Sequence, residues 1–364
     1  MLKLIFFKSF KNTIMNPPIQ LGLCCLNTKL RESKPTVFMS RSMVQKTLEK
    51  PDGIKIAKER SLQNIADIKK MIDWNIKNNI NVMRLSSNIF PHLSNWKVTK
   101  GDTSIGVDDF REYQSLEWCR PQLEEIGKYA RDRNHRLTFH PGQYNQVGAK
   151  TREVYEKTIL DLGLHAKIFD IMGQDANSIM VIHGGGVYGN KTETIDRWKR
   201  QFMEMPQAIR DRLVFENCEK SYCIEDIIPI SENLNIPIVH DTHHYTCYKH
   251  YNPDYKQKSA KKLMLPILDT WRRRGIKPKF HISEQGSGKV GHHSDFVEKI
   301  PKYLLKIKKK HKIDIDIMIE AKMKEQAIMK LHDSYPRLLK HLKKKTTSCS
   351  ESSCTESSCS SDSS

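Results

Sequence analysis

Acidic and imidazole side chains follow short apolar runs at several places in this 364-residue sequence. In residues 236–244, the β-branched pair Ile238 and Val239 predicts a buried strand, and it is followed by Asp241, His243 and His244. Carboxylate oxygen and imidazole nitrogen together are the ligands that hard and borderline divalent cations prefer. Burying these groups at a strand end is unfavourable unless a partner binds them. The segment therefore predicts a metal site.

The same arrangement recurs along the chain, and it yields eight candidate metal ligands: His140, His183, Glu216, Asp241, His244, His281, His293 and Glu320. Clustered carboxylates without cations repel one another and raise one another's pKa values, and metal ions relieve this repulsion. Because a zinc site uses about three protein ligands, a set of this size predicts two or three ions. Multi-metal sites typically hydrolyse phosphoesters: one ion lowers the pKa of a water, and the others stabilise the reacting phosphate and the leaving oxygen.

Strand-like and helix-like segments alternate along the chain, and the candidate ligands fall where the strands end. We predict strands at residues 19–23, 81–85, 136–139, 178–182, 212–215, 238–239, 279–282 and 314–319. We predict helices at residues 61–78, 114–134, 154–172, 192–209, 223–233, 263–273, 296–310 and 326–342.

Eight strand–helix units favour an α/β fold with a closed (β/α)8 TIM barrel, in which the chemistry lies at the carboxyl ends of the strands. A doubly wound sheet is the alternative, but no GxGxxG motif follows the first strand. We expect one barrel domain at residues 18–345, a flexible extension at residues 1–17, and a disordered Ser- and Cys-rich tail at residues 346–364.

The chain is strongly basic, with 61 Lys and Arg against 42 Asp and Glu and a formal net charge of +19. A surplus of this size indicates a polyanionic partner, most simply nucleic acid, although a solvated basic face is the alternative. Combined with phosphoester chemistry, the charge indicates a nucleic-acid backbone as the substrate.

The cysteines and the N-terminal residues give indications of the cellular compartment in which the protein is located. The nine cysteines include no CxxC pair, which indicates reduced thiols in an intracellular protein. No apolar run approaches the roughly 20 residues that cross a bilayer, so we expect no membrane partner. Residues 1–31 are basic and contain no Asp or Glu, which fits a mitochondrial transit peptide or a disordered extension. We expect a monomer located in the nucleus or wherever the DNA is kept.

Eight segments, in order over residues 19–342, resemble the UV damage endonuclease family, a branch of the metal-dependent barrels related to endonuclease IV. They are Leu-Gly-Leu-Cys-Cys-Leu-Asn (21–27), Arg-Leu-Ser-Ser-Asn-Ile-Phe-Pro (84–91), His-Pro-Gly-Gln-Tyr (140–144), His-Gly-Gly-Gly-Val-Tyr-Gly (183–189), Phe-Glu-Asn (215–217), Asp-Thr-His-His (241–244), Lys-Pro-Lys-Phe-His-Ile-Ser (277–283) and Ile-Glu-Ala-Lys (319–322). Each segment alone is weakly diagnostic, but the ordered set is specific.

The resemblance implies metal-ligand roles for all eight candidate ligands, with Mn²⁺ the favoured ion and Zn²⁺ or Mg²⁺ the alternatives. It implies catalytic roles for Glu216, Glu320 and Lys279, where Lys279 matches a lysine that is modified near the metals in that family. Gln143 and Tyr144 match a pair that probes the DNA lesion. An amide and an aromatic ring on a strand-exit loop suit that role, because they can hydrogen-bond and stack where bases are displaced. Packing of Tyr144 on the barrel rim is the alternative.

Two positions depart from the family pattern. Asn95 stands where the family has a further metal-binding His, and His92, three residues earlier, is the candidate replacement. Alternatively Asn95 ligates through its amide oxygen, or one ion is held more weakly. Leu23 stands where family members often carry a probing Tyr, so lesion probing is expected to rest on Asn27, Gln143 and Tyr144.

The implied function is a DNA repair endonuclease. It would nick the strand immediately 5′ of pyrimidine dimers and 6-4 photoproducts, leaving a 3′-hydroxyl and a 5′-phosphate on DNA. Three alternatives remain: an abasic-site endonuclease with the same metals, a sugar isomerase on the same barrel, and a DNA-binding barrel without catalysis, which Asn95 motivates.

Overall fold

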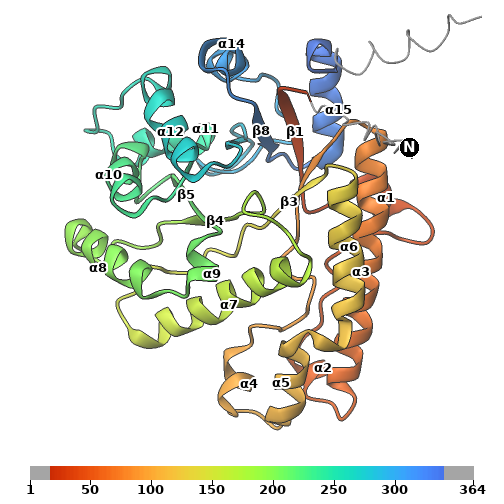
Figure 1. Ribbon diagram of the computed structural model, residues 1–364. Coiled ribbons are helices and arrows are strands. Elements are labelled where there is room, and N and C mark those ends of the chain that lie inside the picture. Colours follow the sequence, from red (N-terminus) through yellow and green to blue (C-terminus); the bar gives the residue numbers. More distant parts are fainter. Residues whose placement is uncertain (1–16, 340–364) are drawn as a thin grey trace, which may run out of the picture.

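The computed structural model describes residues 17–339, in which eight parallel strands alternate with helices (Figure 1). The strands are β1 (Ile19–Cys24), β2 (Val82–Arg84), β3 (Arg136–Thr138), β4 (Met180–His183), β5 (Leu213–Glu216), β6 (Ile238–Val239), β7 (Lys279–Ile282) and β8 (Ile315–Ile319). All eight predicted strands are confirmed to within two residues at each end.

The strands form a ring. Hydrogen bonds join them in the orders β3-β2-β1-β8-β7 and β4-β5-β6. Two isolated parallel bridges, Phe139 with Met180 and Asp241 with His281, connect the ends of these two sheets. The predicted (β/α)8 TIM barrel is therefore confirmed. Every residue of β1 and of β8 is buried, as expected for parallel strands with helices on the outer face and side chains filling the interior.

Helices surround the strands and share one hydrophobic core with them. The longer helices are α3 (Gly53–Lys77), α5 (Val107–Ser115), α6 (Arg120–Asp132), α7 (Arg152–Ile171), α8 (Lys191–Glu204), α10 (Ile224–Leu234), α11 (Thr242–Tyr251), α12 (Ala260–Arg274) and α15 (Lys324–Ser334). The shorter ones are α1 (Thr28–Glu32), α2 (Gln45–Leu48), α4 (Trp96–Lys100), α9 (Gln207–Arg210), α13 (Lys302–Leu305), α14 (Ile307–His311) and the 3₁₀ turns η1 (Glu117–Cys119) and η2 (Pro336–Leu339). Within this shell, α3 and α6 lie side by side (Figure 1).

Proline residues account for several differences between the observed and the predicted helix boundaries. The helix predicted at residues 114–134 begins later, at Arg120, because the end of α5 and the turn η1 occupy its first residues and Pro121 lies in the first turn of α6. Pro206 separates α8 from α9, and the helix predicted from residue 296 begins only after Pro301. The helix predicted from residue 61 begins earlier, at Gly53, so Ser61 lies inside α3, where its hydroxyl donates to the Ala57 carbonyl.

Helices α1, α2, α4 and α11 and most of α5 were not predicted, and α11 carries two of the histidines after β6. Asp241 is its N-cap, and the Asp241 carboxylate accepts hydrogen bonds from the backbone N–H groups of His243 and His244 at 2.7 Å each. A capping carboxylate satisfies backbone donors that the first helical turn leaves free. The acid and the two imidazoles are therefore held in a fixed relation by the start of a helix.

Several expectations concern residues at the margins of the structure. The predicted tail at residues 346–364 and nearly all of the extension at residues 1–17 lie outside the described residues. No helix within residues 17–339 is long and apolar enough to cross a membrane. The six cysteines in this range are free thiols, as the sequence predicted.

A buried network of ion pairs joins the amino ends of β3, β7 and β8. Asp316 of β8 is only 1% exposed, and its carboxylate lies 2.7 Å from the Arg136 guanidinium of β3 and 2.5 Å from the Lys277 ammonium, which precedes β7. Burial opposes ionisation of Asp316, but Lys277 and Arg136 outweigh it and lower its pKa. Three segments far apart in the sequence therefore meet around one carboxylate.

We predict that Asp316→Asn lowers the free energy of unfolding by about 3 kcal/mol at neutral pH, because it leaves two cations without their buried anion. The lowered pKa means that this stabilisation is present above the ordinary Asp value of about 3.9 and is lost as the pH falls through the folded-state value. The difference between wild type and variant in urea unfolding should therefore shrink below pH 4. Asp132→Asn, which removes the exposed partner of Lys128 on α6, is the control and should leave the urea midpoint unchanged.

Candidate metal centre

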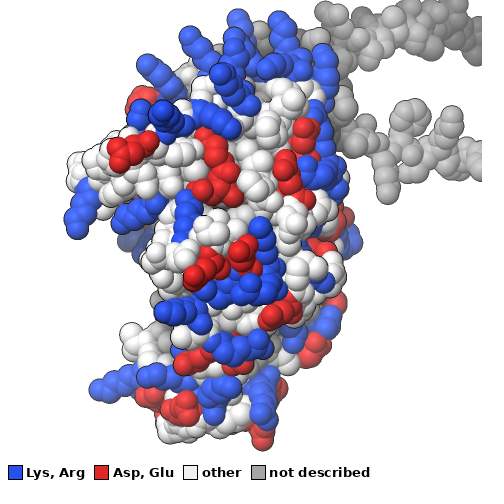
Figure 2. Space-filling model, turned by 90° about the vertical axis from the view of Figure 1, so that its left-hand side faces the viewer, with Lys and Arg blue, Asp and Glu red and all other residues white. Residues whose placement is uncertain are grey.

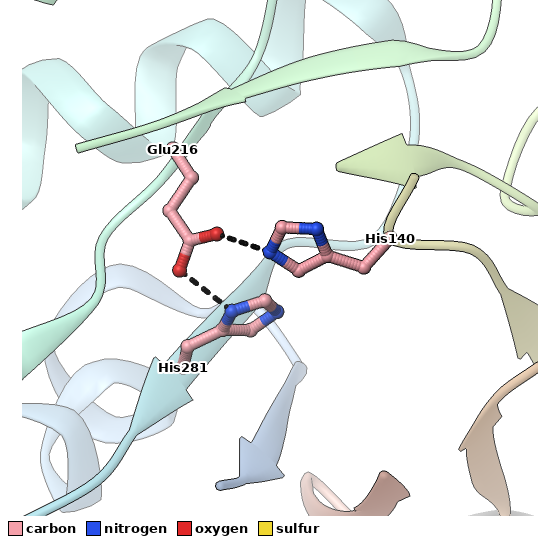
Figure 3. Close-up of side chains that lie close together, drawn as sticks. All are labelled: His140, Glu216 and His281. Atoms are coloured by element: carbon pink, nitrogen blue, oxygen red, sulfur yellow. Dashed lines mark hydrogen bonds and ion pairs between the residues drawn. The ribbon is translucent and has the colours of Figure 1, made fainter. Parts of the chain in front are cut away.

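The Glu216 carboxylate lies at the centre of the ring of strand ends. Glu216 is the last residue of β5 and is fully buried, and its carboxylate accepts hydrogen bonds from His140 Nε2 at 2.8 Å and His281 Nδ1 at 2.7 Å (Figure 3). His183 Nε2 lies 3.2 Å from the same carboxylate. The three imidazoles come from the exits of β3, β4 and β7, so the barrel brings together residues up to 141 positions apart in the chain.

Two further carboxylates complete the cluster. Glu320, which follows β8, has its Oε1 3.4 Å from His281 Nδ1. Asp241 follows β6, and its Oδ1 lies 3.9 Å from His244 Nδ1, which is also 3.8 Å from Glu216 Oε1. Seven of the eight predicted ligands are therefore in one buried cluster.

Within this cluster, sets of three donor atoms lie within 4.8 Å of one another, close enough to hold an ion. The sets are His140–Glu216–His281, His183–Glu219–His244, Glu216–Asp241–His244 and Asp241–His281–Glu320. They overlap, because Glu216, Asp241, His244 and His281 each belong to two sets. The arrangement resembles one shared multi-ion centre more than several separate sites.

Two observations test whether a cation fits. Asp241 Oδ2 and His281 Nε2 are buried and have no hydrogen-bond partner among residues 17–339, so both atoms are available to coordinate a cation. Burial raises the pKa of Asp241, and the neighbouring Glu216 and Glu320 carboxylates raise it further, while His244 opposes them. Excess negative charge with free oxygen and nitrogen donors suits a divalent cation.

The neighbours of these donors fix their orientation. Asn217 donates from Nδ2 to the Asp241 carbonyl at 3.0 Å, and its Oδ1 accepts from the Asp241 backbone N–H at 2.9 Å. The Asn217 carbonyl lies 3.1 Å from His244 Nδ1. Such outer contacts set the tautomer and direction of ligating histidines. Asn217 thus ties the exit of β5 to the start of α11.

Lys279 points into the barrel below the cluster. Its side chain is fully buried on β7, and its ammonium nitrogen lies 2.9 Å from Thr138 Oγ1 of β3. Burial, followed by the charges of Arg84 and Arg136, lowers the pKa of Lys279 to about 7.

The predicted probing pair Gln143 and Tyr144 lies on an exposed loop after β3. Tyr144 is 63% exposed, and its ring lies so close to Gly142 that a Cβ there would approach it to 2.4 Å. Gly142 therefore allows the ring to lie over the backbone. Both residues line a cleft of about 880 Å³ whose walls also include His140, His183, His244 and Glu320. The exposed aromatic ring and the buried donors thus share one opening.

Three predicted site residues lie apart from the cluster. His293 has its ring centroid 6.4 Å from that of His244 and belongs to none of the donor sets found among the described residues. His92 lies 2.7 Å from the Met43 carbonyl through Nε2 and is likewise outside these sets. Asn27 is fully buried and caps α1, with Oδ1 accepting from the Leu30 N–H, and it does not line the cleft. Their roles stay predictions.

Asn95 has a local structural role. Its Oδ1 accepts from the Val98 N–H and so caps α4, while its Nδ2 donates to Gln45. Asn95 and His92 do not line the 880 Å³ cleft. They line a second cavity of about 310 Å³, and Ser87 and Tyr144 line both.

Three residues at the cluster were not singled out from the sequence. Glu219 contributes to one donor set and follows Glu216 by three residues, a spacing that could have identified it. Arg84 lies at the end of β2 with Nη1 2.6 Å from Glu320 Oε1. The Cys218 sulfur accepts from the backbone N–H groups of Ser221 and Tyr222 at 3.2 Å each. Burial opposes ionisation of Cys218, but His183 and these backbone donors lower its pKa.

Comparison with solved structures supports both the fold and the relationship. The crystal structure of SacUVDE superposes with a TM-score of 0.72 at 25% identity, covering 88% of this chain and 99% of the other. A D-tagatose 3-epimerase-like protein superposes with a TM-score of 0.52 at 14% identity, covering 90% of this chain and 99% of the other, and shows the shared fold alone.

Sequence comparison gives the same relationship. The chain is 36% identical over 320 residues to a protein of Acanthamoeba polyphaga mimivirus that is provisionally named a UV-damage endonuclease, covering 87% of this chain and 91% of the other. It is 36% identical over 329 residues to the UV-damage endonuclease of Schizosaccharomyces pombe, covering 87% of this chain but only 50% of the yeast protein. The chain thus spans about half the length of the yeast relative.

A family model described as UV-endonuclease UvdE matches residues 19–351, which include the whole barrel and every residue of the cluster. The chain therefore belongs to the UV-endonuclease UvdE family.

Proposed function

We propose that this protein is a DNA repair endonuclease that hydrolyses the phosphodiester immediately 5′ of UV photoproducts, both pyrimidine dimers and 6-4 photoproducts. The products are a 3′-hydroxyl and a 5′-phosphate. Family membership supports the substrate class. The observation that carries the chemistry is the convergence of three imidazoles on the buried Glu216 carboxylate, beside a buried Asp241 oxygen without a partner.

The cluster would hold two or three divalent cations, with Mn²⁺ favoured and Zn²⁺ or Mg²⁺ as alternatives. Carboxylate oxygens suit Mn²⁺ and Mg²⁺, and imidazole nitrogens suit several first-row metals. When bound, such ions lower the pKa of a water and neutralise charge that develops on the phosphate. Glu216 and Asp241 would each serve two ions, since each belongs to two donor sets. Lys279 and Glu320 complete the proposed catalytic set.

Recognition is proposed to depend on how easily the DNA deforms. A photoproduct weakens stacking and pairing, so damaged DNA bends and opens at lower cost than intact DNA. Gln143 and Tyr144 lie exposed at the mouth of the cleft, where displaced bases would meet them. They supply an amide for hydrogen bonding and a ring for stacking.

Basic side chains supply attraction for the DNA backbone over a wider area than the cleft. The formal net charge of the chain is +19. Figure 2 shows Lys and Arg side chains gathered at the end of the molecule that carries α14 in Figure 1, with acidic side chains interspersed elsewhere on that face. Charge distributed in this way raises the rate of encounter with a polyanion and gives a salt-dependent affinity.

A short duplex with one cyclobutane dimer, labelled at the 5′ end of the damaged strand, tests the reaction. We expect Mn²⁺-dependent cleavage to one product that ends in a 3′-hydroxyl immediately before the dimer, and no cleavage in EDTA, because chelation removes the ions. Matched undamaged and abasic duplexes are the controls. Cleavage of the abasic duplex alone would support the abasic-site alternative, and EDTA-resistant cleavage would contradict the metal centre.

We predict that Glu216→Gln lowers the cleavage rate by at least about 100-fold, since even outer contacts of metal ligands are worth 10- to 100-fold. Mn²⁺ binding measured by calorimetry should weaken in parallel, while affinity for the dimer duplex should stay close to wild type. Glu124→Gln, at an exposed position on α6, is the matched control for charge and should change neither measurement. Normal cleavage by the Glu216 variant would remove Glu216 from the site.

We predict that Tyr144→Ala weakens binding of the dimer duplex roughly 10- to 100-fold, because stacking on an aromatic side chain is worth about 1–3 kcal/mol per base. Binding of undamaged duplex should change much less. Fluorescence anisotropy without added metal separates binding from cleavage. Leu265→Ala, which removes another exposed apolar side chain on α12, is the control. Equal losses on damaged and undamaged DNA would mean that Tyr144 does not sense the lesion.

A further inference from the structure

Arg84 occupies the wall of the cleft beside the metal-ligand cluster. It is the last residue of β2, and its side chain is 20% exposed. Its Nη1 donates to Glu320 Oε1 at 2.6 Å, and its Nε donates to the Cys25 sulfur at 3.2 Å. Two contacts on different strand exits therefore hold the guanidinium in one orientation.

The third guanidinium nitrogen is unused. Arg84 lines the cleft together with His140, His183, His244 and Glu320, and its Nη2 has no hydrogen-bond partner among residues 17–339. A guanidinium carries five N–H donors in a planar fork and remains charged at all physiological pH values. The fork matches two oxygens of a phosphate, and charge-assisted bonds of this kind are roughly twice as strong as neutral ones.

Pairing with Glu320 alone does not account for this arrangement. Cations bound to Glu320 would share the charge of that carboxylate and leave the Arg84 charge only partly balanced. A largely buried charge without a full counter-charge is unfavourable, so an anion that enters the cleft and reaches the guanidinium is stabilised there. The only other Lys or Arg among the described residues that line the cleft is Lys220, an exposed residue whose ammonium lies over the Tyr251 ring.

We infer that Arg84 binds a nonbridging oxygen of the phosphodiester that is cleaved, an inference that rests on the proposed function. Arg84 then acts on the substrate directly, and the Glu320 and Cys25 contacts position it. Lys220 contributes a point charge to the DNA backbone near the mouth of the cleft.

Substitution at both positions tests the assignment on the dimer duplex with Mn²⁺. Arg84→Met should lower kcat/KM about 100-fold, which is within the range for losing one donor to a reacting oxyanion. Arg84→Lys should recover only part of that loss, because it restores the charge without the fork. Lys220→Met should weaken DNA binding and reduce its salt dependence. Arg111→Met, which removes an exposed arginine of α5 outside the cleft, is the matched control and should leave kcat/KM within about threefold of wild type.

Two further readouts separate substrate contact from a purely structural role. Mn²⁺ affinity and the urea midpoint of Arg84→Lys should match wild type. A sulfur in place of one of the two nonbridging oxygens at the cleaved linkage should slow the wild-type enzyme but slow Arg84→Met no further.

Other results would overturn the assignment. Wild-type rates in Arg84→Met, or a loss of rate that follows a loss of Mn²⁺ affinity in both variants, would show that Arg84 does not bind the phosphate. If the wild-type protein itself left the dimer duplex intact, the proposed function would fail and the inference with it.

Discussion

The structure depends on keeping a charged carboxylate, Glu216, at the centre of a protein interior. Removing such a group from water costs several kcal/mol, and only close charged or hydrogen-bonding partners offset this. Here the partners are His140, His183 and His281, from three other strand exits. Because each partner comes from a different strand, the cluster forms only when the ring of strands has closed. The site can therefore form only in the closed barrel, and the closed barrel must accommodate the charged site.

Both ends of the barrel contain buried carboxylates, but the partners of these carboxylates differ between the two ends. At the amino ends of the strands, Asp316 is matched by Arg136 and Lys277, so its charge is balanced within the chain. At the carboxyl ends, Asp241 Oδ2 and His281 Nε2 lack protein partners. A carboxylate paired with cationic side chains holds strands together, whereas donors without protein partners are available to ligands. This contrast locates function at one end of the fold and stability at the other, as is general in such barrels.

Much of this fold was predictable because parallel strands leave a simple pattern: a short buried run followed by polar residues. That pattern identified all eight strands and seven of the clustered ligands. It failed where tertiary contacts decide the structure. Asp241 is a local signal for the start of α11, but the residues after it have no clear helical periodicity of apolar side chains, so the helix was missed. Asn27 and Asn95 carry the same amide, and only the structure shows that both are used to cap helices. Arg84 acquires its significance from Glu320, 236 residues away.

The overlap among the donor sets has a thermodynamic consequence. Since Glu216, Asp241, His244 and His281 each belong to two sets, an ion that enters one set withdraws charge and orients a ligand in the next. Occupancies at such sites form linked equilibria, in which each binding event changes the affinity of its neighbours by the same factor in both directions. Because charge withdrawn from a shared ligand weakens the next set, loading would depend on the concentration of free metal less steeply than independent sites allow. Scarcity of metal in the cell would then leave many copies partly loaded.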